Sequence, residues 1–197
     1  MRYPDHLLKL IGVLKKLPGV GSRSAERFAF QLIDWSPEKL AEMGDIIKSI
    51  KENLNYCSEC GALIETKCPL CSSSRRDPHL LCIVASSKDI FAIEETREYQ
   101  GHYHVLGSLL SPLQGQSISS GTIENIKNRI SKLQITEVII ALDATLEGDA
   151  TSLFLKKELS SLPLSISRLA LGLPMGTALD FIDGGTLGRA LAYRRNY

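Results

Sequence analysis

Several features that would assign a class of function are absent from this sequence. No apolar run approaches the ~18 residues that a membrane-spanning helix needs. The first residues, Met1–His6, lack the apolar stretch and small-residue cleavage site of a secretory signal peptide. We therefore expect a cytoplasmic protein that does not enter a membrane. In that reducing compartment, its five cysteines indicate metal ligands and a spare thiol rather than disulfides.

The sequence also lacks the glycine-rich motifs of common nucleotide-binding folds. No G-x-x-x-x-G-K-[ST] stretch occurs, which argues against a P-loop ATPase. The turn Ala85–Lys88, which follows an expected strand, contains no glycine and so argues against a Rossmann-type dinucleotide site. Internal repeats and low-complexity tracts are absent as well.

Net charge is small overall, but the charged residues are unevenly placed. The net charge is only +1, so the total gives no argument for binding nucleic acid. Residues 1–30, however, carry six Lys and Arg residues against two acidic ones, a surplus of four. This local surplus matters more than the total because phosphate attraction acts over roughly a Debye length of ~10 Å. With 197 residues, 44% of them apolar, the chain can form one large domain or two to three small ones.

Helical periodicity dominates the first quarter of the chain. Apolar residues at spacings of three and four predict a first helix, which Pro18–Gly21 stops with a tight turn. Ser22 is expected to cap a second helix, and Ser36-Pro37-Glu38 to begin a third. The expected buried faces are Leu7, Leu10, Ile11, Leu14 and Leu17 in the first helix, Ala25, Phe28, Ala29, Leu32 and Ile33 in the second, and Leu40, Met43, Ile47, Ile50 and Leu54 in the third.

The first two helices and their glycine turn are typical of a helix-hairpin-helix that binds DNA. Gly19 and Gly21 can adopt positive φ and let backbone N–H groups approach a phosphate, while the second helix presents its positive N-terminal end. Arg23 and Arg27 lie one turn apart and can reach the same DNA strand, near Lys15. No set of base-reading residues is visible, so we expect sequence-independent binding. An ordinary helical hairpin with solvated charges is the alternative.

Four of the five cysteines form two CxxC pairs. Cys57 and Cys60 are followed, after seven intervening residues, by Cys68 and Cys71. Each CxxC turn brings two thiolates to one side, and two such turns complete a tetrahedron around zinc. All four positions are filled, so we predict one structural Zn²⁺ per chain with no place for a catalytic water; two redox pairs or unligated thiols are the alternative. Cys82 lies in an apolar run and is expected to be buried.

From Leu80 onward, apolar runs alternate with amphipathic segments. This alternation predicts a parallel β-sheet with crossover helices. The expected strands are Leu80–Ala85, Tyr103–Leu106, Glu137–Leu142 and Ser165–Ala170, and the expected helices are Lys88–Thr96, Thr122–Leu133 and Ala150–Leu159.

Three carboxylates follow the third expected strand, and all three are expected on one loop. Asp143, Glu147 and Asp149 could hold Mg²⁺ weakly for phosphoryl chemistry. Alternatively, Asp149 complements a helix dipole and Asp143 caps a turn, which we slightly prefer. Among the residues of the second expected strand, Tyr103 is expected to pack in the core, with a base-stacking platform as the alternative. His104 is expected to be a hydrogen-bonded structural residue.

Five stretches of the chain occur together, and in this order, in one known family. They are Leu17–Phe30, the four-cysteine segment Cys57–Cys71, Gly101–Gly115, Glu147–Thr151 and Arg168–Leu191. Gly-x-Tyr-His-Val-Leu, followed by Ser-Pro-Leu and then by Gly-Leu-Pro, is the most specific combination. On these motifs nearly the whole chain resembles the RecR family of bacterial recombination mediators.

The resemblance implies a multidomain α and α/β protein. Its expected parts are a helix-hairpin-helix DNA-binding domain (1–56), a C4-type zinc finger (57–78), a Toprim α/β domain with a parallel sheet (79–175) and a C-terminal assembly arm (176–197). It implies a mediator of recombinational DNA repair rather than an enzyme, acting with RecO and RecF to help RecA load at single-strand gaps. It also implies a ring-like homotetramer on DNA, associated with the nucleoid.

Individual residues follow the family to different degrees. Arg23 stands where the family usually has a DNA-contacting Lys, and Arg27 matches a family Arg; Arg preserves this role because it binds phosphate at least as well. The four cysteines match the zinc ligands of the family, and Glu147 matches an acidic position in the family's Toprim domain. Ala85 stands where the first Toprim strand usually ends in Glu, and this departure weakens the case for metal-dependent catalysis. Ile182–Thr186 is less acidic than usual, so the arm departs from the family there.

Two other functions fit parts of the sequence. A small Toprim nuclease or primase-like enzyme would use Mg²⁺ on the three carboxylates, but Ala85 argues against it. A zinc-stabilised assembly adaptor would touch DNA only through partner proteins. If the protein is a mediator or an adaptor rather than an enzyme, Glu147 and Asp149 are expected to form an acidic patch that a partner protein binds.

Overall fold

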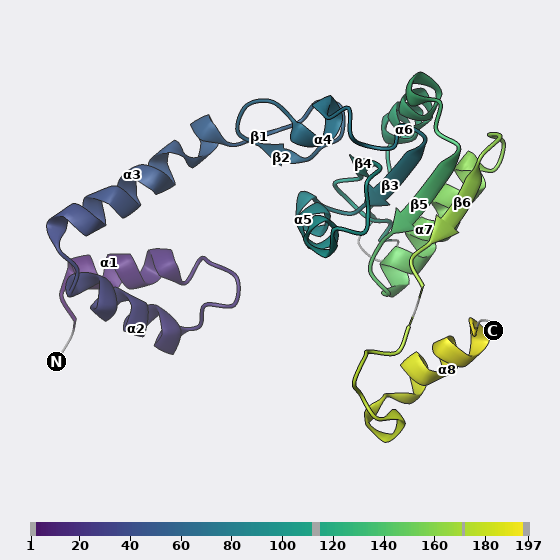
Figure 1. Cartoon of the computed structure of the whole chain (residues 1–197). Helices are drawn as coiled ribbons and strands as arrows, with labels where there is room; N and C mark the ends of the chain where they lie inside the picture. The colour runs from purple at the N-terminus through teal and green to yellow at the C-terminus, as the bar shows by residue number, and fades with distance from the viewer. Residues whose placement is uncertain (1–2, 112–114, 171, 195–197) are drawn as a thin grey trace. The chain divides into compact units, whose positions relative to one another are not determined.

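The computed structural model describes residues 3–111, 115–170 and 172–194 (Figure 1). Contacts within the chain divide it into two compact units, Met1–Asn53 and Leu54–Tyr197. No helix in the described ranges combines the length and the apolar character needed to span a membrane.

The N-terminal unit consists of three helices: α1 (Asp5–Leu14), α2 (Ser22–Ile33) and α3 (Pro37–Asn53). Helices α1 and α2 lie side by side (Figure 1) and form the core of this unit. That core contains Leu7, Ile11, Ala25 and Ala29. Both alanines are fully buried, since methyl-sized side chains let two helices approach closely.

The structure corrects several details predicted for the first two helices. Helix α1 ends at Leu14 and Leu17 is 55% exposed, because the chain has already entered the turn. Ser22 does not cap α2: Gly21 is the N-cap residue, and Ser22 is the first helical residue. Phe28 and Ile33 are exposed rather than buried, since α1 covers only the narrow alanine face of α2.

Helix α3 has no buried residue. Its apolar side chains were predicted to face a core, but they remain exposed, because the short unit offers nothing to cover them. We refer to them as the α3 stripe, which comprises Leu40, Met43, Ile46, Ile47 and Ile50.

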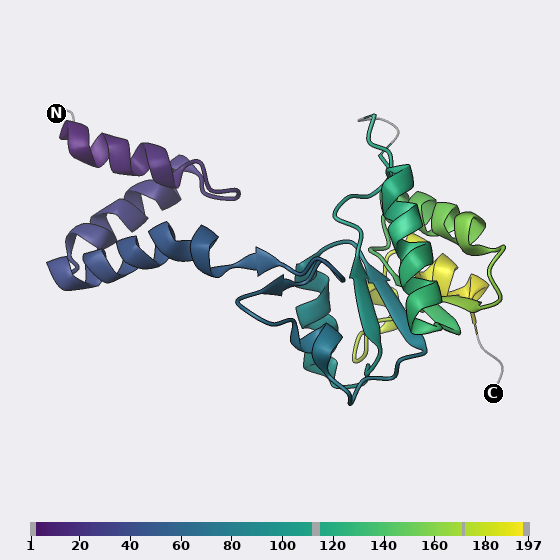
Figure 2. The ribbon, with the colours of Figure 1, turned by 90° about the horizontal axis from the view of Figure 1, so that it is seen from above.

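The second unit contains the predicted parallel sheet, in the order β4-β3-β5-β6. Its strands are β3 (Leu80–Val84), β4 (His102–Val105), β5 (Glu137–Ala141) and β6 (Ser165–Arg168), and its helices are α5 (Ser87–Thr96), α6 (Ser120–Leu133) and α7 (Leu146–Leu159). Leu81 and Ile83 of the central strand pack with α6 and α7 on one face. Cys82 and Val84, on the opposite face, pack with α5 and the cysteine-rich segment. In Figure 2, helices α6 and α7 lie on one side of the sheet and α5 on the other. The predicted fold is therefore confirmed.

The cysteine-rich segment precedes this sheet and packs beside its edge strand, β4. It contains the antiparallel pair β1 (Asn55–Tyr56) and β2 (Leu63–Ile64), then the short helix α4 (Pro69–Ser72). Contacts place this segment in the same unit as the sheet, whereas the four-part domain division stays a prediction.

The C-terminal segment follows β6 as a short 3-10 helix, η2 (Leu179–Phe181), and helix α8 (Gly184–Ala192). Asp183 caps α8 by accepting a hydrogen bond from the Thr186 N–H at 2.9 Å. None of the helical residues of this arm is buried, and Phe181 is 82% exposed.

Candidate metal centre and nucleic-acid interface

The four predicted metal ligands come together in two turns. Cys57 and Cys60 form the first turn, which we call the first knuckle: the Gly61 N–H donates to the Cys57 carbonyl at 2.8 Å. Cys68 and Cys71 form the second knuckle, in which Cys68 is the N-cap of α4 and a proline occupies the first helical position. These local turns explain why each CxxC pair directs both sulfur atoms to one side.

The spacing of the sulfur atoms fits a tetrahedral metal ion. All four Sγ atoms lie within 4.8 Å of one another, with 3.6 Å between Cys60 and Cys68 and 4.0 Å between Cys57 and Cys71. A tetrahedral Zn²⁺ with Zn–S bonds of ~2.3 Å places its sulfur ligands about 3.8 Å apart. Three of the cysteines are buried and Cys71 is partly buried. The cluster can therefore hold one structural metal ion in a closed site, with all four ligands supplied by the protein.

A residue that the sequence interpretation missed lies against this cluster. Arg129 of α6 donates from Nη2 to the Cys71 Sγ at 3.3 Å and from Nη1 to the carbonyl of Glu59. A hydrogen bond with the Cys60 thiol, assisted by the Arg129 guanidinium, lowers the pKa of Cys71 to about 5. The same hydrogen bond and burial raise the pKa of Cys60. A thiolate is the form that binds a metal, so the lowered pKa of Cys71 suits that residue to a ligand role.

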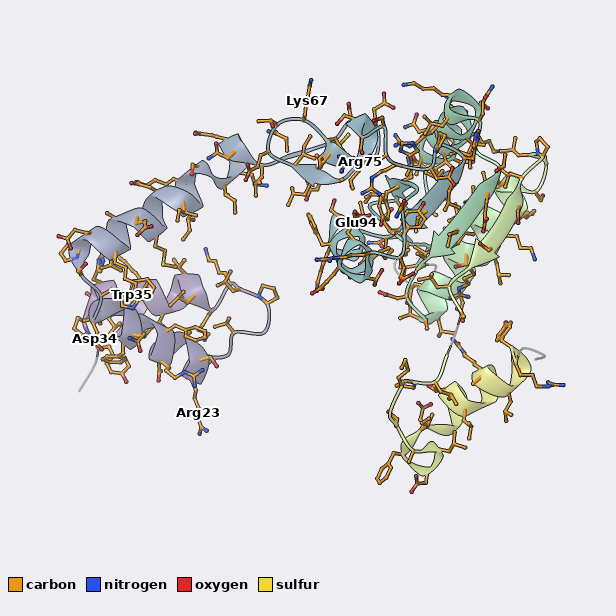
Figure 3. All side chains as sticks on the ribbon, in the orientation of Figure 1. Arg23, Asp34, Trp35, Lys67, Arg75 and Glu94 are labelled. Atoms are coloured by element: carbon orange, nitrogen blue, oxygen red, sulfur yellow. The ribbon has the colours of Figure 1, made fainter. Side chains whose placement is uncertain are left out.

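The predicted DNA-binding residues gather where the α1–α2 turn meets α2. Gly19 adopts a φ of +80° and nothing lies within 4 Å of the position of an added Cβ. Gly21, in contrast, has a φ of −76°, so only one of the two glycines uses the positive region. Arg23 and Arg27 are exposed on α2, and Lys15 is exposed at the end of α1. In Figure 3, Arg23 points away from the helical hairpin.

The N-terminal end of α2 offers donors as well as charge. The first N–H groups of a helix have no partner within it, and the first bond that closes α2 runs from the Ala25 N–H to the Gly21 carbonyl at 2.9 Å. Among the residues in the three described ranges, no carboxylate forms an ion pair with Arg23 or Arg27. Free amides beside uncompensated guanidinium groups can bind a phosphate backbone without reading bases.

The three acidic residues after β5 are not arranged as a metal site. Glu147 and Asp149 lie in the first turn of α7 and only Asp143 lies in the preceding turn, so the expectation that all three share a loop is wrong. The four cysteines are the only group of His, Cys, Asp or Glu with metal-binding spacing in the described part of the chain.

Asp149 instead binds two arginines. Its Oδ1 accepts from Arg168 Nη2 at 2.6 Å, and its Oδ2 accepts from Arg189 Nη2 at 3.0 Å. The hydrogen bond from Arg168, followed by the charges of both arginines, lowers the pKa of the carboxyl group. Since Arg168 ends β6 and Arg189 belongs to α8, Asp149 links the sheet to the C-terminal arm.

The aromatic and histidine side chains of β4 are structural. Tyr103 is fully buried and donates to Glu94 Oε1 at 2.6 Å, which confirms core packing and rules out a base-stacking platform. His104 is buried, which lowers its pKa to about 4. Its Nδ1 has no hydrogen-bond partner within the described residues, so the expected hydrogen bond is not seen at that atom.

Comparison with known proteins gives matches along most of the chain. A family model described as "RecR, helix-hairpin-helix" matches residues 7–51, one for the Toprim domain matches 79–170, and one described as "RecR, C-terminal" matches 172–195. Recombination protein RecR of Protochlamydia amoebophila is 54% identical over 198 residues, which span the whole of both chains. Recombination protein RecR of Chlamydia abortus is 49% identical over 200 residues, again with full coverage of both.

A relative from Chlamydia pneumoniae, with the same name, is 49% identical over all of this chain and 99% of its own. These proteins are named for recombination and not for an enzymatic reaction, in agreement with the expectation that the chain is not an enzyme. Full-length identity near one half, together with the matched hairpin, Toprim and C-terminal segments, shows that this chain belongs to the RecR family of recombination proteins and has a role in recombination repair.

Proposed function

We propose that the chain is a sequence-independent DNA-binding mediator, and that the helical hairpin is its DNA contact. The observation that carries this proposal is the pair Arg23 and Arg27, both exposed beside the free N–H groups of α2. Gly19, Gly21 and Lys15 complete the contact surface. Family membership supports the same role, since the matched hairpin occupies residues 7–51.

The test is the salt dependence of DNA binding. The double variant Arg23→Ala/Arg27→Ala should bind all sequences more weakly. It should also reduce the slope of log K against log salt by about 1.8 for duplex and about 1.4 for single strands, because two phosphate contacts are lost. Lys156→Ala/Lys157→Ala removes two exposed charges from α7 and is the matched control. Equal slopes for both double variants would place the DNA contact elsewhere.

The metal proposed for the four cysteines is Zn²⁺, at one ion per chain. Four thiolates in a closed tetrahedron favour zinc over divalent ions that prefer oxygen ligands, such as Mg²⁺ and Ca²⁺. The ion would join the two knuckles and supply folding energy rather than chemistry. Elemental analysis of protein purified without chelator should find one equivalent of zinc, and its absence would refute the assignment.

The cellular partners proposed are RecO, RecF and RecA, with the chain acting in the cytoplasm at the nucleoid. In this role it helps RecA to replace single-strand-binding protein at gaps. Support comes from the family alone, so the decisive assay is reconstitution. RecA filament formation on gapped, protein-coated DNA should require the chain together with RecO and RecF, and an equal rate without the chain would contradict this role.

The assembly proposed is a ring-like tetramer. Two exposed apolar surfaces support self-association: the α3 stripe and the arm with Phe181. Contiguous exposed apolar surface of this kind commonly marks a protein interface. The mass in solution, with and without gapped DNA, would test the assembly, and a monomer under both conditions would refute it.

A Toprim nuclease or primase-like activity is not favoured. Ala85 offers no ligand at the end of β3, and both carboxylate oxygens of Asp149 are bonded to arginines. Glu147 remains as a partly exposed acidic residue that a partner protein can bind. Incubation with single-stranded, duplex and gapped DNA plus Mg²⁺ or Mn²⁺ should give no cleavage; cleavage lost in Glu147→Ala would reverse this conclusion.

A further inference from the structure

Arg129 is a buried cation on the apolar face of a helix. It lies on α6 between Ile126 and Ile130, both of which belong to the core, and its own side chain is only 6% exposed. A guanidinium does not lose its proton in a protein, so burying it is costly unless its charge and its N–H groups find partners. The partners of Arg129 therefore indicate its role.

Those partners belong to the two knuckles. Nη1 donates to the backbone carbonyl of Glu59, inside the first knuckle. Nη2 donates to the Sγ of Cys71, which ends the second knuckle, at 3.3 Å. One planar group thus bonds to both knuckles at once. The rigid fork of an arginine suits this task because its N–H groups are fixed relative to one another.

The sheet holds the first knuckle through two further hydrogen bonds. The Val105 N–H donates to the Cys60 carbonyl at 2.8 Å, and the Ser87 hydroxyl donates to the Gly61 carbonyl at 2.8 Å. These bonds come from β4 and α5, whereas Arg129 comes from α6. The cysteine-rich segment is therefore fixed to the α/β body from three elements, and the contact from α6 is the one that reaches a sulfur atom.

We propose that Arg129 is a positioning residue of the metal centre. It fixes the spacing of the two knuckles and sets a positive charge against the sulfur of Cys71. A divalent ion with four thiolates has a net negative formal charge, which the buried guanidinium beside one sulfur, itself 3.5 Å from the Glu59 carboxylate, offsets in part. The inference rests on the metal site proposed above and adds a role for a residue outside the four ligands. Removing a group that hydrogen-bonds to a metal ligand typically changes metal affinity by about 10- to 100-fold.

Lys132 provides a matched control on the same helix. Its Nζ lies 3.1 Å from the carboxylate of Glu59, so it contacts the same knuckle. It is 66% exposed and has no contact with sulfur in the described residues. A second control, Ile130→Val, removes one methyl group from the core beside Arg129 and lowers stability without touching the knuckles.

The experiment measures zinc release from the full chain to a chromogenic chelator in excess. Arg129→Gln should release zinc about 10- to 100-fold faster than the wild type. Arg129→Lys should also release it several-fold faster, because an ammonium group keeps the charge but cannot span both knuckles. Lys132→Gln and Ile130→Val should stay close to the wild-type rate. The visible spectrum of the Co²⁺-substituted protein should shift in the Arg129 variants alone.

The outcomes separate this proposal from the metal assignment. Wild-type protein without zinc would refute the metal site itself. Zinc-loaded wild type, with an unchanged release rate and Co²⁺ spectrum in folded Arg129→Gln, would overturn the role of Arg129 only. If Arg129→Gln does not fold, Arg129→Lys decides: faster release supports the positioning role, and wild-type release overturns it. Acceleration in Ile130→Val equal to that in the Arg129 variants would also overturn it, since general loosening of the core would then suffice.

Discussion

Gly148 stands between the two acidic residues in the first turn of α7, and we predict that Gly148→Ala destabilises the protein. Its N–H donates to the Thr145 hydroxyl at 3.1 Å, which caps the helix. A Cβ at this position would lie 2.0 Å from the backbone carbonyl oxygen of Asp143. Backbone cannot rotate away as a flexible side chain can, so the turn between β5 and α7 would have to open by more than an ångström.

The expected cost follows from this overlap. Forcing an extra carbon into a packed site typically costs about 1–3 kcal/mol. For a chain of this size, each kcal/mol lowers the melting temperature by about 2–4 °C. We therefore expect Gly148→Ala to melt about 2–12 °C below the wild type. Asp149 is the next residue, so its bonds to Arg168 and Arg189 should weaken as well.

The assay is thermal unfolding followed by circular dichroism, with Gly121→Ala as the control. Gly121 also lies in the first turn of a helix, α6, but its added Cβ would meet its nearest neighbour, the Ser119 Oγ, at an ordinary 3.8 Å. Alanine is a better helix former than glycine, so Gly121→Ala should be neutral or stabilising by up to about 1 kcal/mol. A Gly148→Ala protein that melts with or above the wild type would refute the steric argument.

Three further predictions concern the metal, the arm and the assembly. Cys60→Ser should lose the metal and melt at a lower temperature, as metal analysis and unfolding with and without chelator would show. Because its hydrogen bond with Arg168 lowers the pKa of Asp149, the anchoring of the arm should be complete above the ordinary Asp pKa of about 3.9 and be lost as the pH falls below it. Hydrogen exchange of α8 should show the same loss at neutral pH in Asp149→Asn, and α8 amides that stay protected there would contradict it. Deleting residues 177–197 should reduce the mass of the assembly in light scattering, and a truncated chain of unchanged mass would argue against an assembly role.

The sheet was predictable because its signal is local. The two inner strands, β3 and β5, are short apolar runs, because burial on both faces of a parallel sheet makes such runs nearly continuous in sequence. The observed strands β3, β4, β5 and β6 accordingly fall within a residue or two of the predicted ranges. The cysteine cluster was predictable for a similar reason, since each CxxC turn is built from neighbouring residues.

The errors arose where a partner from elsewhere in the chain decides the outcome. The stripe of α3 has helical spacing, but periodicity does not say whether a covering surface exists. Asp149 was interpreted as a dipole complement in slight preference to a metal ligand, and its bond to Arg189 was missed because Arg189 lies 40 residues away in sequence. The turn into α2 used Gly21 rather than Ser22 as its cap, a one-residue shift that pattern alone does not resolve.

Arg129 left a signal that can be recognised in retrospect. It follows Ile123 and Ile126 at the spacing of an apolar helix face and precedes Ile130. An arginine in the middle of such a face has to find a buried partner. The sequence could thus have marked Arg129 as unusual, but its contact with a cysteine 58 positions earlier depends on the tertiary fold.

If copies of the chain associate through the α3 stripe as proposed above, the small core of the N-terminal unit would link DNA binding to the amount of protein present. Among residues 3–53 of this unit, only Leu7, Ile11, Ala25 and Ala29 are buried, and a unit of this size with so little buried surface is marginally stable by itself. A second copy on the α3 stripe would stabilise it by mass action, by about 2.7 kcal/mol when its concentration exceeds Kd a hundred-fold. The helical hairpin would then lose order on dilution and gain it as cellular copy number rises. The capacity to hold DNA would therefore increase more steeply than in proportion to expression.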